Sequence, residues 1–171
     1  AAAASDLADL AEIDSWDLPA IVREIRTRFA AALTGEAALQ KLPVSEWSML
    51  IQPGTMPDAY RPTVWDVVAH DALAFAALGE RGLADPEDAF EIEATSAALG
   101  PVDMFRQADP AQLTTDSDSP LLQTWQLFQR LLAFHADDTD RTAFLAADLD
   151  RILWAAGDIT ENRPPLSMTV R

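Results

Sequence analysis

The chain has 171 residues, 49% of them hydrophobic and 23% charged, which is the composition of a folded protein rather than a disordered one. Twelve basic residues stand against 28 acidic ones, giving a formal net charge of −16, and so negative a surface repels the phosphate groups of nucleic acid. The lack of cysteine excludes disulfides, thiolate metal sites and catalytic thiols from this stretch. No apolar run reaches the length of about 20 residues that crosses a bilayer, so we expect no membrane insertion by this segment.

Helical periodicity dominates the first half of the chain. Asp17 is a suitable N-cap, and Pro19 a suitable first-turn residue, for a long helix that reaches Gly35. Residues 42–51 predict a short helix. Residues 52–62 contain three prolines and a glycine and predict a loop.

A second long helix is predicted after this loop. Thr63 and Asp66 have the spacing of a capping box, with Asp in the place of the usual Glu. An apolar stripe follows at intervals of three and four residues, and we expect Gly79 and Gly82 to end the helix.

Two further long helices are predicted in the second half of the chain. Residues 85–119 show no single pattern, apart from a short helix expected at 100–108. Residues 120–136 and 139–158 are both periodic, and the acidic turn between them is short enough to make an antiparallel helical hairpin.

These elements predict an all-α fold of about five to seven helices in antiparallel hairpins, forming a bundle or a short helical-repeat array with a loop-rich middle and an extended C-terminal tail. We expect residues 1–14 to be a flexible N-terminal segment, residues 15–158 a helical domain, and residues 159–171 an extended tail or linker. The predicted structural core consists of Ile21, Ile25, Phe29, Trp47, Trp65, Val68, Phe75, Trp125, Phe128, Leu132, Leu149 and Leu153.

Asp66 and His70 lie one turn apart on the second long helix, so their side chains can meet. An aspartate that orients a histidine is half of a nucleophilic triad, but the sequence has neither a cysteine nor a Gly-x-Ser-x-Gly elbow. A structural ion pair is the favoured interpretation, and we expect no catalytic residue in this chain.

Acidic residues gather in two turns. Oxygen-rich clusters can bind calcium, but both turns lack the glycine and the distal glutamate of a helix-loop-helix calcium loop. Acidic residues before a helix are also what the helix dipole favours, and two histidines far apart in sequence make a zinc site improbable. We therefore predict no metal and no cofactor. The clusters are Asp116 with Asp118, and His135 with Asp137, Asp138 and Asp140.

Several short runs, taken in order, resemble the N-terminal region of large bacterial alpha-2-macroglobulin-like proteins. The resemblance covers roughly Ser15 to Ala155, and its most specific run is "RPTVWDVVAHDALAF". The other runs are "SWDLPAIVREI", "LPVSEWSMLI", "LFQRLLAFHADD" and "ADLDRILW".

The resemblance implies a non-catalytic helical domain of a very large secreted protein that binds or entraps proteases in the bacterial cell envelope or periplasm. The partners it implies are neighbouring domains of a larger chain, together with proteases or an envelope protein. Nothing in this sequence matches the Cys-Gln thioester motif of some members, a strand-rich macroglobulin domain or a bait region.

One alternative is a free-standing helical-repeat adaptor that binds a peptide or protein in a groove. Such an adaptor requires an exposed apolar or aromatic concave face, for which Trp125, Phe134 and Trp154 are the candidates.

Another alternative is a small metal-dependent hydrolase with an all-α fold. Its ligands would be Asp66, His70, His135 and the cluster Asp137–Asp140, so the two histidines would have to converge.

Overall fold

The fold is built from helices. The computed structural model describes residues 16–51, 55–77, 92, 96–112 and 119–161. Within these residues there are six α-helices, three short 3-10 helices and no strand, which confirms the predicted all-α class. The α-helices are α2 (Leu18–Leu33), α3 (Glu36–Leu39), α4 (Val64–Ala77), α6 (Val102–Gln107), α7 (Pro120–Phe134) and α8 (Thr142–Glu161), and the 3-10 helices are η2 (Val44–Trp47), η3 (Asp58–Tyr60) and η4 (Pro110–Gln112).

α2 and α7 begin where the sequence supplies a cap. The carboxylate of Asp17 accepts a hydrogen bond from the backbone N–H of Ala20 at 2.9 Å, at the start of α2. The hydroxyl of Ser119 accepts one from the backbone N–H of Leu122 at 3.2 Å, at the start of α7. Each cap satisfies a donor that the first turn of a helix cannot pair internally.

α4 begins with the predicted capping box. The backbone N–H and the hydroxyl of Thr63 both donate to the carboxylate of Asp66 at 2.8 Å, and the backbone N–H of Asp66 donates to the Thr63 hydroxyl at 3.3 Å. The two residues therefore satisfy each other's polar groups, as the motif requires.

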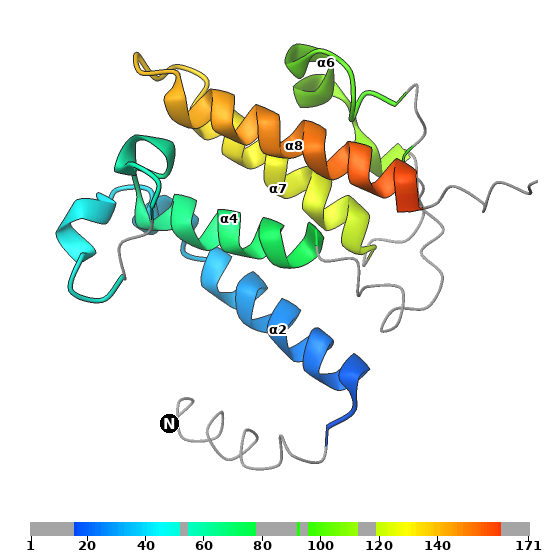
Figure 1. Ribbon diagram of the computed structural model, residues 1–171, viewed down its shortest axis with the longest axis horizontal. Coiled ribbons are helices and arrows are strands. Elements are labelled where there is room, and N and C mark those ends of the chain that lie inside the picture. The colour runs from blue at the N-terminus through cyan, green and yellow to red at the C-terminus, as the bar shows by residue number, and fades with distance from the viewer. Residues whose placement is uncertain (1–15, 52–54, 78–91, 93–95, 113–118, 162–171) are drawn as a thin grey trace, which may run out of the picture.

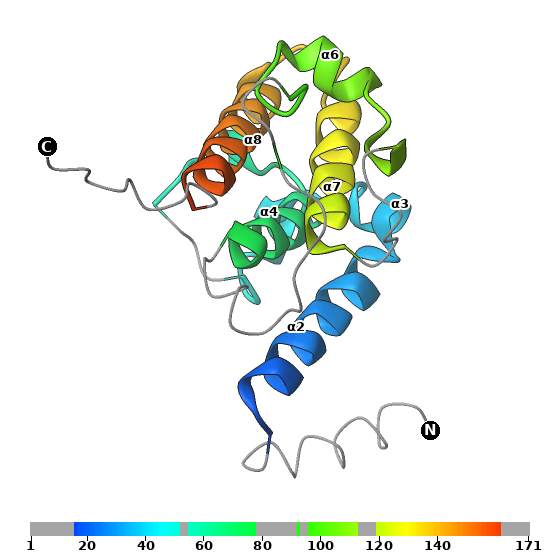
Figure 2. The ribbon, with the colours of Figure 1, turned by 90° about the vertical axis from the view of Figure 1, so that its right-hand side faces the viewer.

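α7 lies at the centre of the arrangement. α8 runs antiparallel beside it and forms the predicted hairpin, while α4 and α6 contact other sides of α7 (Figures 1 and 2). α2 packs against α4 on the side away from α8. This order leaves α2 and α8 as the two outer helices, each with one face free of the central helices.

Aromatic side chains fill the space between α6, α7 and α8. Trp125, which has no exposed surface, stacks on Phe105 of α6 with ring centroids 5.0 Å apart. Trp154 of α8 meets Trp125 edge-on at 6.5 Å and lies 5.4 Å from Phe128. Offset and edge-on aromatic pairs stabilise a core beyond the area they bury, so these rings join the hairpin to α6.

A buried arginine joins α8 to the turn before α6. Arg151 is only 1% exposed, and its guanidinium donates to the carbonyl oxygens of Ala98 at 2.5 Å and Gly100 at 3.1 Å. It also donates to the carboxylate of Asp148 from Nε at 2.8 Å, and lies 4.9 Å from the ring centroid of Phe105. A buried charge is tolerated only when it is compensated in this way, so Arg151 fixes the position of residues 96–100.

The core differs from the prediction at three positions, because Trp47, Leu149 and Leu153 are exposed. The remaining predicted core residues divide into two groups. Trp65, Trp125, Phe128 and Leu132 are buried, whereas Ile21, Ile25, Phe29, Val68 and Phe75 are partly buried.

Trp47 is exposed because its segment lies at the edge of the fold. The short helix predicted at 42–51 is a 3-10 helix of four residues followed by turns. An isolated antiparallel pairing of Pro43 with Thr63 holds its start against the beginning of α4. None of the long helices in the described part of the chain covers this segment, and Trp47 is 37% exposed.

Leu149 and Leu153 are exposed because α8 carries apolar residues on two faces. Its inner face places Phe144, Ala147 and Trp154 against α7, in the same helical row as Arg151. The two leucines lie on the outer face. Three- and four-residue spacing occurs on both faces, so periodicity alone does not select the one that packs.

The C-terminal boundary also differs from the prediction. α8 continues through Gly157 to Glu161, so residues 159–161 of the expected tail are helical. The rest of that tail, the expected flexible segment 1–14, and Gly79 and Gly82 lie outside the described residues. Among the described helices, none combines the length and apolar character needed to span a membrane.

Candidate functional site

Asp66 and His70 do not form the pair that their spacing suggested, because each is held by another helix. The carboxylate of Asp66 has no exposed surface, and its Oδ1 lies 2.8 Å from Nε2 of His135, at the end of α7. Nδ1 of His70 lies 3.2 Å from the carboxylate of Asp150 on α8. Asp66 and His70 therefore each pair with a residue from another part of the chain, and not with each other along α4.

His135 joins two carboxylates. Its Nδ1 lies 2.7 Å from Asp138, while its Nε2 contacts Asp66, and the side chain is 2% exposed. We call Asp66, His135 and Asp138 the His135 clasp. Burial acts to lower the pKa of His135, but the hydrogen bonds and negative charges of the two aspartates outweigh it, so the pKa is raised above the ordinary value of 6.5.

The His135 clasp is suited to structure rather than catalysis. A general base needs a ring nitrogen that can reach the substrate's proton. Both ring nitrogens of His135 are occupied by carboxylates, and the Asp66 carboxylate also caps α4. The clasp therefore joins the start of α4 to the end of α7.

The acidic turn between α7 and α8 caps helices. Asp140 accepts hydrogen bonds from the hydroxyl of Thr142 at 2.6 Å and from its backbone N–H at 2.9 Å, and these bonds lower the pKa of Asp140. Arg141 donates to the backbone carbonyls of Ala136 and His135 at the end of α7. These contacts use the polar groups of the turn to satisfy the ends of two helices.

No group of three His, Asp or Glu side chains in the described part of the chain is arranged to hold a metal ion. Asp116 and Asp118 lie outside the described residues. The two histidines contact different acidic residues. His135 contacts Asp66 and Asp138, whereas His70 contacts Asp150. The residues that the metal-dependent hydrolase would need as ligands therefore belong to two separate ion-pair groups, one around His135 and one around His70.

His70 borders a pocket between α4, α7 and α8. This pocket has a volume of about 350 Å³ and is lined by apolar residues of α4, α7 and α8, with Arg61, His70 and Asp150 as its polar groups. Among the described residues that line it, none carries a hydroxyl, thiol or amine that could act as a nucleophile. His70 and Asp150, which lie 3.2 Å apart, are held to each other as an ion pair across α4 and α8.

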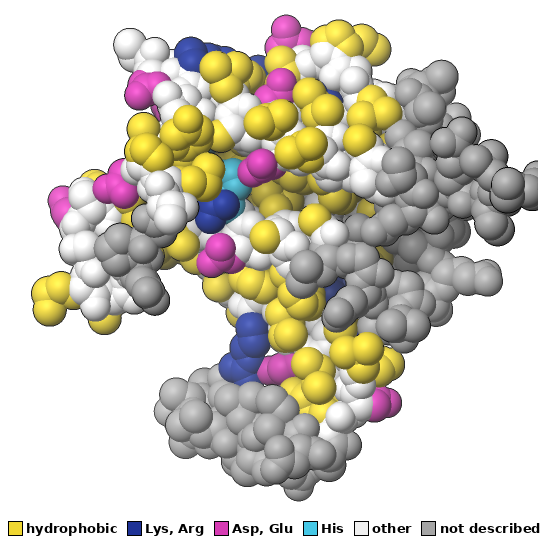
Figure 3. Space-filling model, viewed as in Figure 1, with side chains coloured by type: hydrophobic (Ala, Val, Ile, Leu, Met, Phe, Trp, Pro, Cys, Tyr) yellow, Lys and Arg dark blue, Asp and Glu magenta, His cyan; other side chains and the backbone are white. Residues whose placement is uncertain are grey.

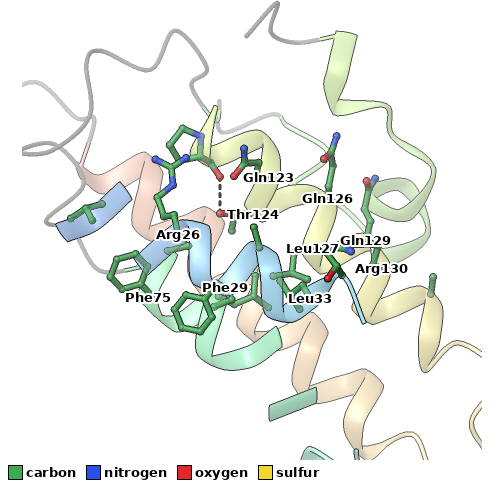
Figure 4. A pocket seen from close by; sticks show the side chains of 18 of the residues that line it. Arg26, Phe29, Leu33, Phe75, Gln123, Thr124, Gln126, Leu127, Gln129 and Arg130 are labelled. Atoms are coloured by element: carbon green, nitrogen blue, oxygen red, sulfur yellow. Dashed lines mark hydrogen bonds between the residues drawn. The ribbon is translucent and has the colours of Figure 1, made fainter. Parts of the chain in front are cut away.

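A larger pocket is a groove between α2, α4 and α7, with a volume of about 860 Å³ (Figure 4). Its apolar floor includes Phe29 and Leu33 of α2, Phe75 of α4 and Leu127 of α7. The rings of Phe29 and Phe75 are 5.9 Å apart. Arginine and glutamine side chains stand along its edge, and we refer to this pocket as the α2–α4–α7 groove.

The outer face of α8 carries a row of exposed apolar side chains. Leu145 is 61% exposed, Leu149 56%, Ile152 38% and Leu153 61%. We call these four residues the α8 stripe, and Figure 3 shows apolar side chains gathered over this helix. Single exposed leucines are common on protein surfaces, whereas these four residues share one face of the helix, which makes the α8 stripe a candidate contact surface.

The three aromatic residues expected to form an adaptor's exposed face do not form one: two are buried and the third is partly buried. Trp125 has no exposed surface, Trp154 is 6% exposed, and Phe134 is partly buried against Trp65 with ring centroids 5.4 Å apart. The groove that does exist involves α2 and the opposite side of α7. Sequence reasoning missed it because the glutamines at 123, 126 and 129 are spaced by one turn but carry no recognised motif.

In comparisons with known proteins, no family model matches this sequence, and neither a curated protein nor a solved structure matches it significantly.

Proposed function

We propose that this chain is a non-catalytic helical domain that docks, through the α8 stripe, against neighbouring domains of a larger chain. The α8 stripe carries the proposal. Its four side chains lie on one face of a helix whose opposite face is fully used in the core. Covering them would remove apolar surface from water, which favours association by about 25 cal/mol for each Å² buried.

The polar groups of the described residues support a non-catalytic role. His135 has both ring nitrogens engaged by carboxylates, and His70 is paired with Asp150. The guanidinium of Arg151 likewise donates its hydrogen bonds to backbone carbonyls and to the carboxylate of Asp148. Each buried ionisable group among the described residues thus has a structural partner, as in a scaffold.

The larger protein that we propose is an envelope protein of the alpha-2-macroglobulin-like class, located in the periplasm or cell envelope, which binds or entraps proteases. This part of the proposal rests on the sequence resemblance that runs through α2, α4 and the α7–α8 hairpin. In that setting the helical domain would position neighbouring domains or contact an envelope protein.

The test compares this chain alone with the product of its full native reading frame. Covalent surface labelling should modify Leu145, Leu149 and Leu153 in the isolated chain and leave them protected in the longer protein. Met49 and Leu50, which are 96% and 78% exposed on a different part of the surface, serve as internal controls. Equal labelling of the α8 stripe in both proteins would contradict docking through this face.

One observation favours a second candidate function, a free-standing adaptor. The α2–α4–α7 groove has the size of a ligand site and an apolar floor. The reading frame distinguishes the two functions, because an adaptor would end close to Arg171, whereas the envelope protein would continue through strand-rich domains.

A further inference from the structure

The pocket beside His70 lies between α4 and α8, and we refer to it as the α4–α8 pocket. Asp150, Leu153, Trp154 and Gly157 form one row of α8 and line one side of it, and α4 lines the opposite side. Figure 3 shows a hollow with apolar side chains between these helices, with basic, histidine and acidic side chains at its edge. Its volume of about 350 Å³ is near the lower end of the range for ligand sites, so it suits a small molecule better than a peptide.

The interior of the α4–α8 pocket is apolar and partly aromatic. Leu73, Phe128 and Trp154 line it, and all three are buried. The ring centroids of Phe128 and Trp154 are 5.4 Å apart. Because aromatic rings pack favourably with one another in offset or edge-on arrangements, this interior suits a ligand that carries an aromatic ring.

Two buried nitrogen atoms of the lining residues have no hydrogen-bond partner in the described part of the chain. One is Nε1 of Trp154, which can only donate, and the other is Nε of Arg61. Nη1 of Arg61 lies 3.7 Å from the carboxylate of Asp71, which is too far for a hydrogen bond. A buried donor without an acceptor costs free energy, so a ligand that brings an acceptor would be favoured here.

The described lining offers these two donors no carboxylate that is not already in use. Asp150 is the one acidic residue among the described lining residues, and Nδ1 of His70 lies 3.2 Å from it. The Asp150 side chain is also 46% exposed, so that solvent screens its charge. Arg61 and Trp154 therefore present donors beside an apolar interior, and the acceptor has to come from outside the chain.

We infer that the α4–α8 pocket binds a small aromatic carboxylate. Its ring would lie against Leu73 and Phe128, and its carboxylate would accept hydrogen bonds from the guanidinium of Arg61 and the indole N–H of Trp154. This class of ligand combines the acceptor that the lining lacks with the ring that the interior suits.

The same groups select against other small molecules. An aromatic amine would bring a second positive charge to Arg61 and would supply no acceptor. A neutral hydrocarbon would leave the donors of Arg61 and Trp154 unpaired, and unpaired polar groups beside a bound ligand reduce its affinity.

The test follows the five indole N–H signals of the 171-residue chain by proton–nitrogen NMR during a titration with phenylacetate. The signal of Trp154, identified by its loss in Trp154→Phe, should move as the ligand is added. We expect a dissociation constant of about 1 mM or lower. Trp65 is the internal control, because its Nε1 is also buried without a partner but Trp65 does not line this pocket.

Benzylamine is the comparison ligand, since it has an ammonium group in place of the carboxylate of phenylacetate. It should bind at least about tenfold more weakly, because its charge has the same sign as that of Arg61. The net charge of −16 attracts cations to the protein as a whole. A preference for the carboxylate would therefore have to come from the lining of the pocket.

Two variants change the pocket itself. Gly157→Leu adds a side chain where no atom lies within 4 Å of the new Cβ, and should weaken phenylacetate by about tenfold or more by filling the space. Ala156→Leu is the matched control, since Ala156 is exposed on the same helix and does not line the pocket. Arg61→Met removes the charged donor and should weaken phenylacetate by about tenfold and reduce its advantage over benzylamine.

Thermal unfolding followed by circular dichroism shows whether each variant is folded, and if Gly157→Leu does not fold, Arg61→Met decides. Binding that is lost in Gly157→Leu and kept in Ala156→Leu supports the proposal. The proposal is wrong if about 10 mM phenylacetate leaves the Trp154 signal unmoved, if benzylamine binds as tightly, or if the folded pocket variants bind phenylacetate as the native chain does. These measurements use the isolated chain and alter none of the four residues of the α8 stripe, so they are independent of docking through it.

Discussion

The two helices of the C-terminal hairpin, α7 and α8, show when periodicity identifies a buried face and when it does not. On α7 the predicted core residues Trp125, Phe128 and Leu132 are all buried. On α8 the predicted residues Leu149 and Leu153 are exposed, and Trp154 is buried instead. α7 is surrounded by α4, α6 and α8, so almost any apolar row on it is covered, whereas α8 is an outer helix that packs against α7 and η3 and leaves one row of apolar residues exposed.

The largest expected effect tests the buried side of this comparison. Trp125→Ala on α7 should lower the free energy of unfolding by about 3–5 kcal/mol, because it removes a large side chain from a packed aromatic cluster. Leu149→Ala on α8 should change it by less than about 0.5 kcal/mol, as expected for an exposed residue. Urea denaturation measures both, and equal losses would mean that the two faces of α8 are assigned incorrectly.

A smaller effect tests the inner face of α8. Arg151→Met removes the donors that hold the carbonyls of Ala98 and Gly100, and should lower the free energy of unfolding by about 1–3 kcal/mol. Arg23→Met, at an exposed position of α2, is the control and should leave the stability nearly unchanged. A loss in Arg151→Met that is no greater than in the control would show that the arginine is not a structural anchor.

The end of the hairpin contributes a pH-dependent effect. Because the pKa of His135 is raised in the fold, the protonated form is the one that folding stabilises. The stability that it contributes is fully present below pH 6.5, the ordinary value of the histidine pKa, and is lost as the pH rises through the raised value. The difference in unfolding free energy between the native protein and His135→Gln should therefore be larger at low pH and shrink as the pH rises.

Urea denaturation of both proteins between about pH 5.5 and pH 9 checks this dependence, in a range where isolated carboxylates stay ionised. Asp138→Asn should reduce the pH dependence in part, since Asp138 is one of the two carboxylates that hold the ring. A difference that is constant with pH, or that grows as the pH rises, would contradict the His135 clasp.

The smallest expected effect concerns the outer face of α8. The double variant Leu149→Glu with Leu153→Glu should keep the stability of the isolated chain within about 0.5 kcal/mol. In the longer protein, the α8 variant should abolish docking. Unchanged docking would mean that the α8 stripe is not part of the interface.

Local signals in the sequence predicted much of the fold. Asp17, Ser119 and the pair Thr63–Asp66 mark three helix starts, because a short polar side chain before a helix can pair only with the first few N–H groups of that helix. The hairpin was also predictable, since seven residues between two long helices leave them no arrangement but side by side.

The polar sites could not be predicted from spacing. Asp66 and His70 are four residues apart on one helix, yet Asp66 contacts His135, which is 69 residues away in sequence, and His70 contacts Asp150. A buried carboxylate needs a hydrogen-bond donor in its low-dielectric surroundings, and the packing of the helices decides which donor reaches it. Partners of this kind depend on how α4, α7 and α8 meet.

The sequence by itself determined the helical class, the helix starts and the α7–α8 hairpin, because capping and periodicity depend on residues within one or two turns. Only the tertiary structure decided which face of α8 is buried, which acid holds each histidine, and where a groove remains open. Those features follow from the packing of whole helices, in which α2 and α8 each cover one side of a neighbour and keep another side out of contact with the other described helices.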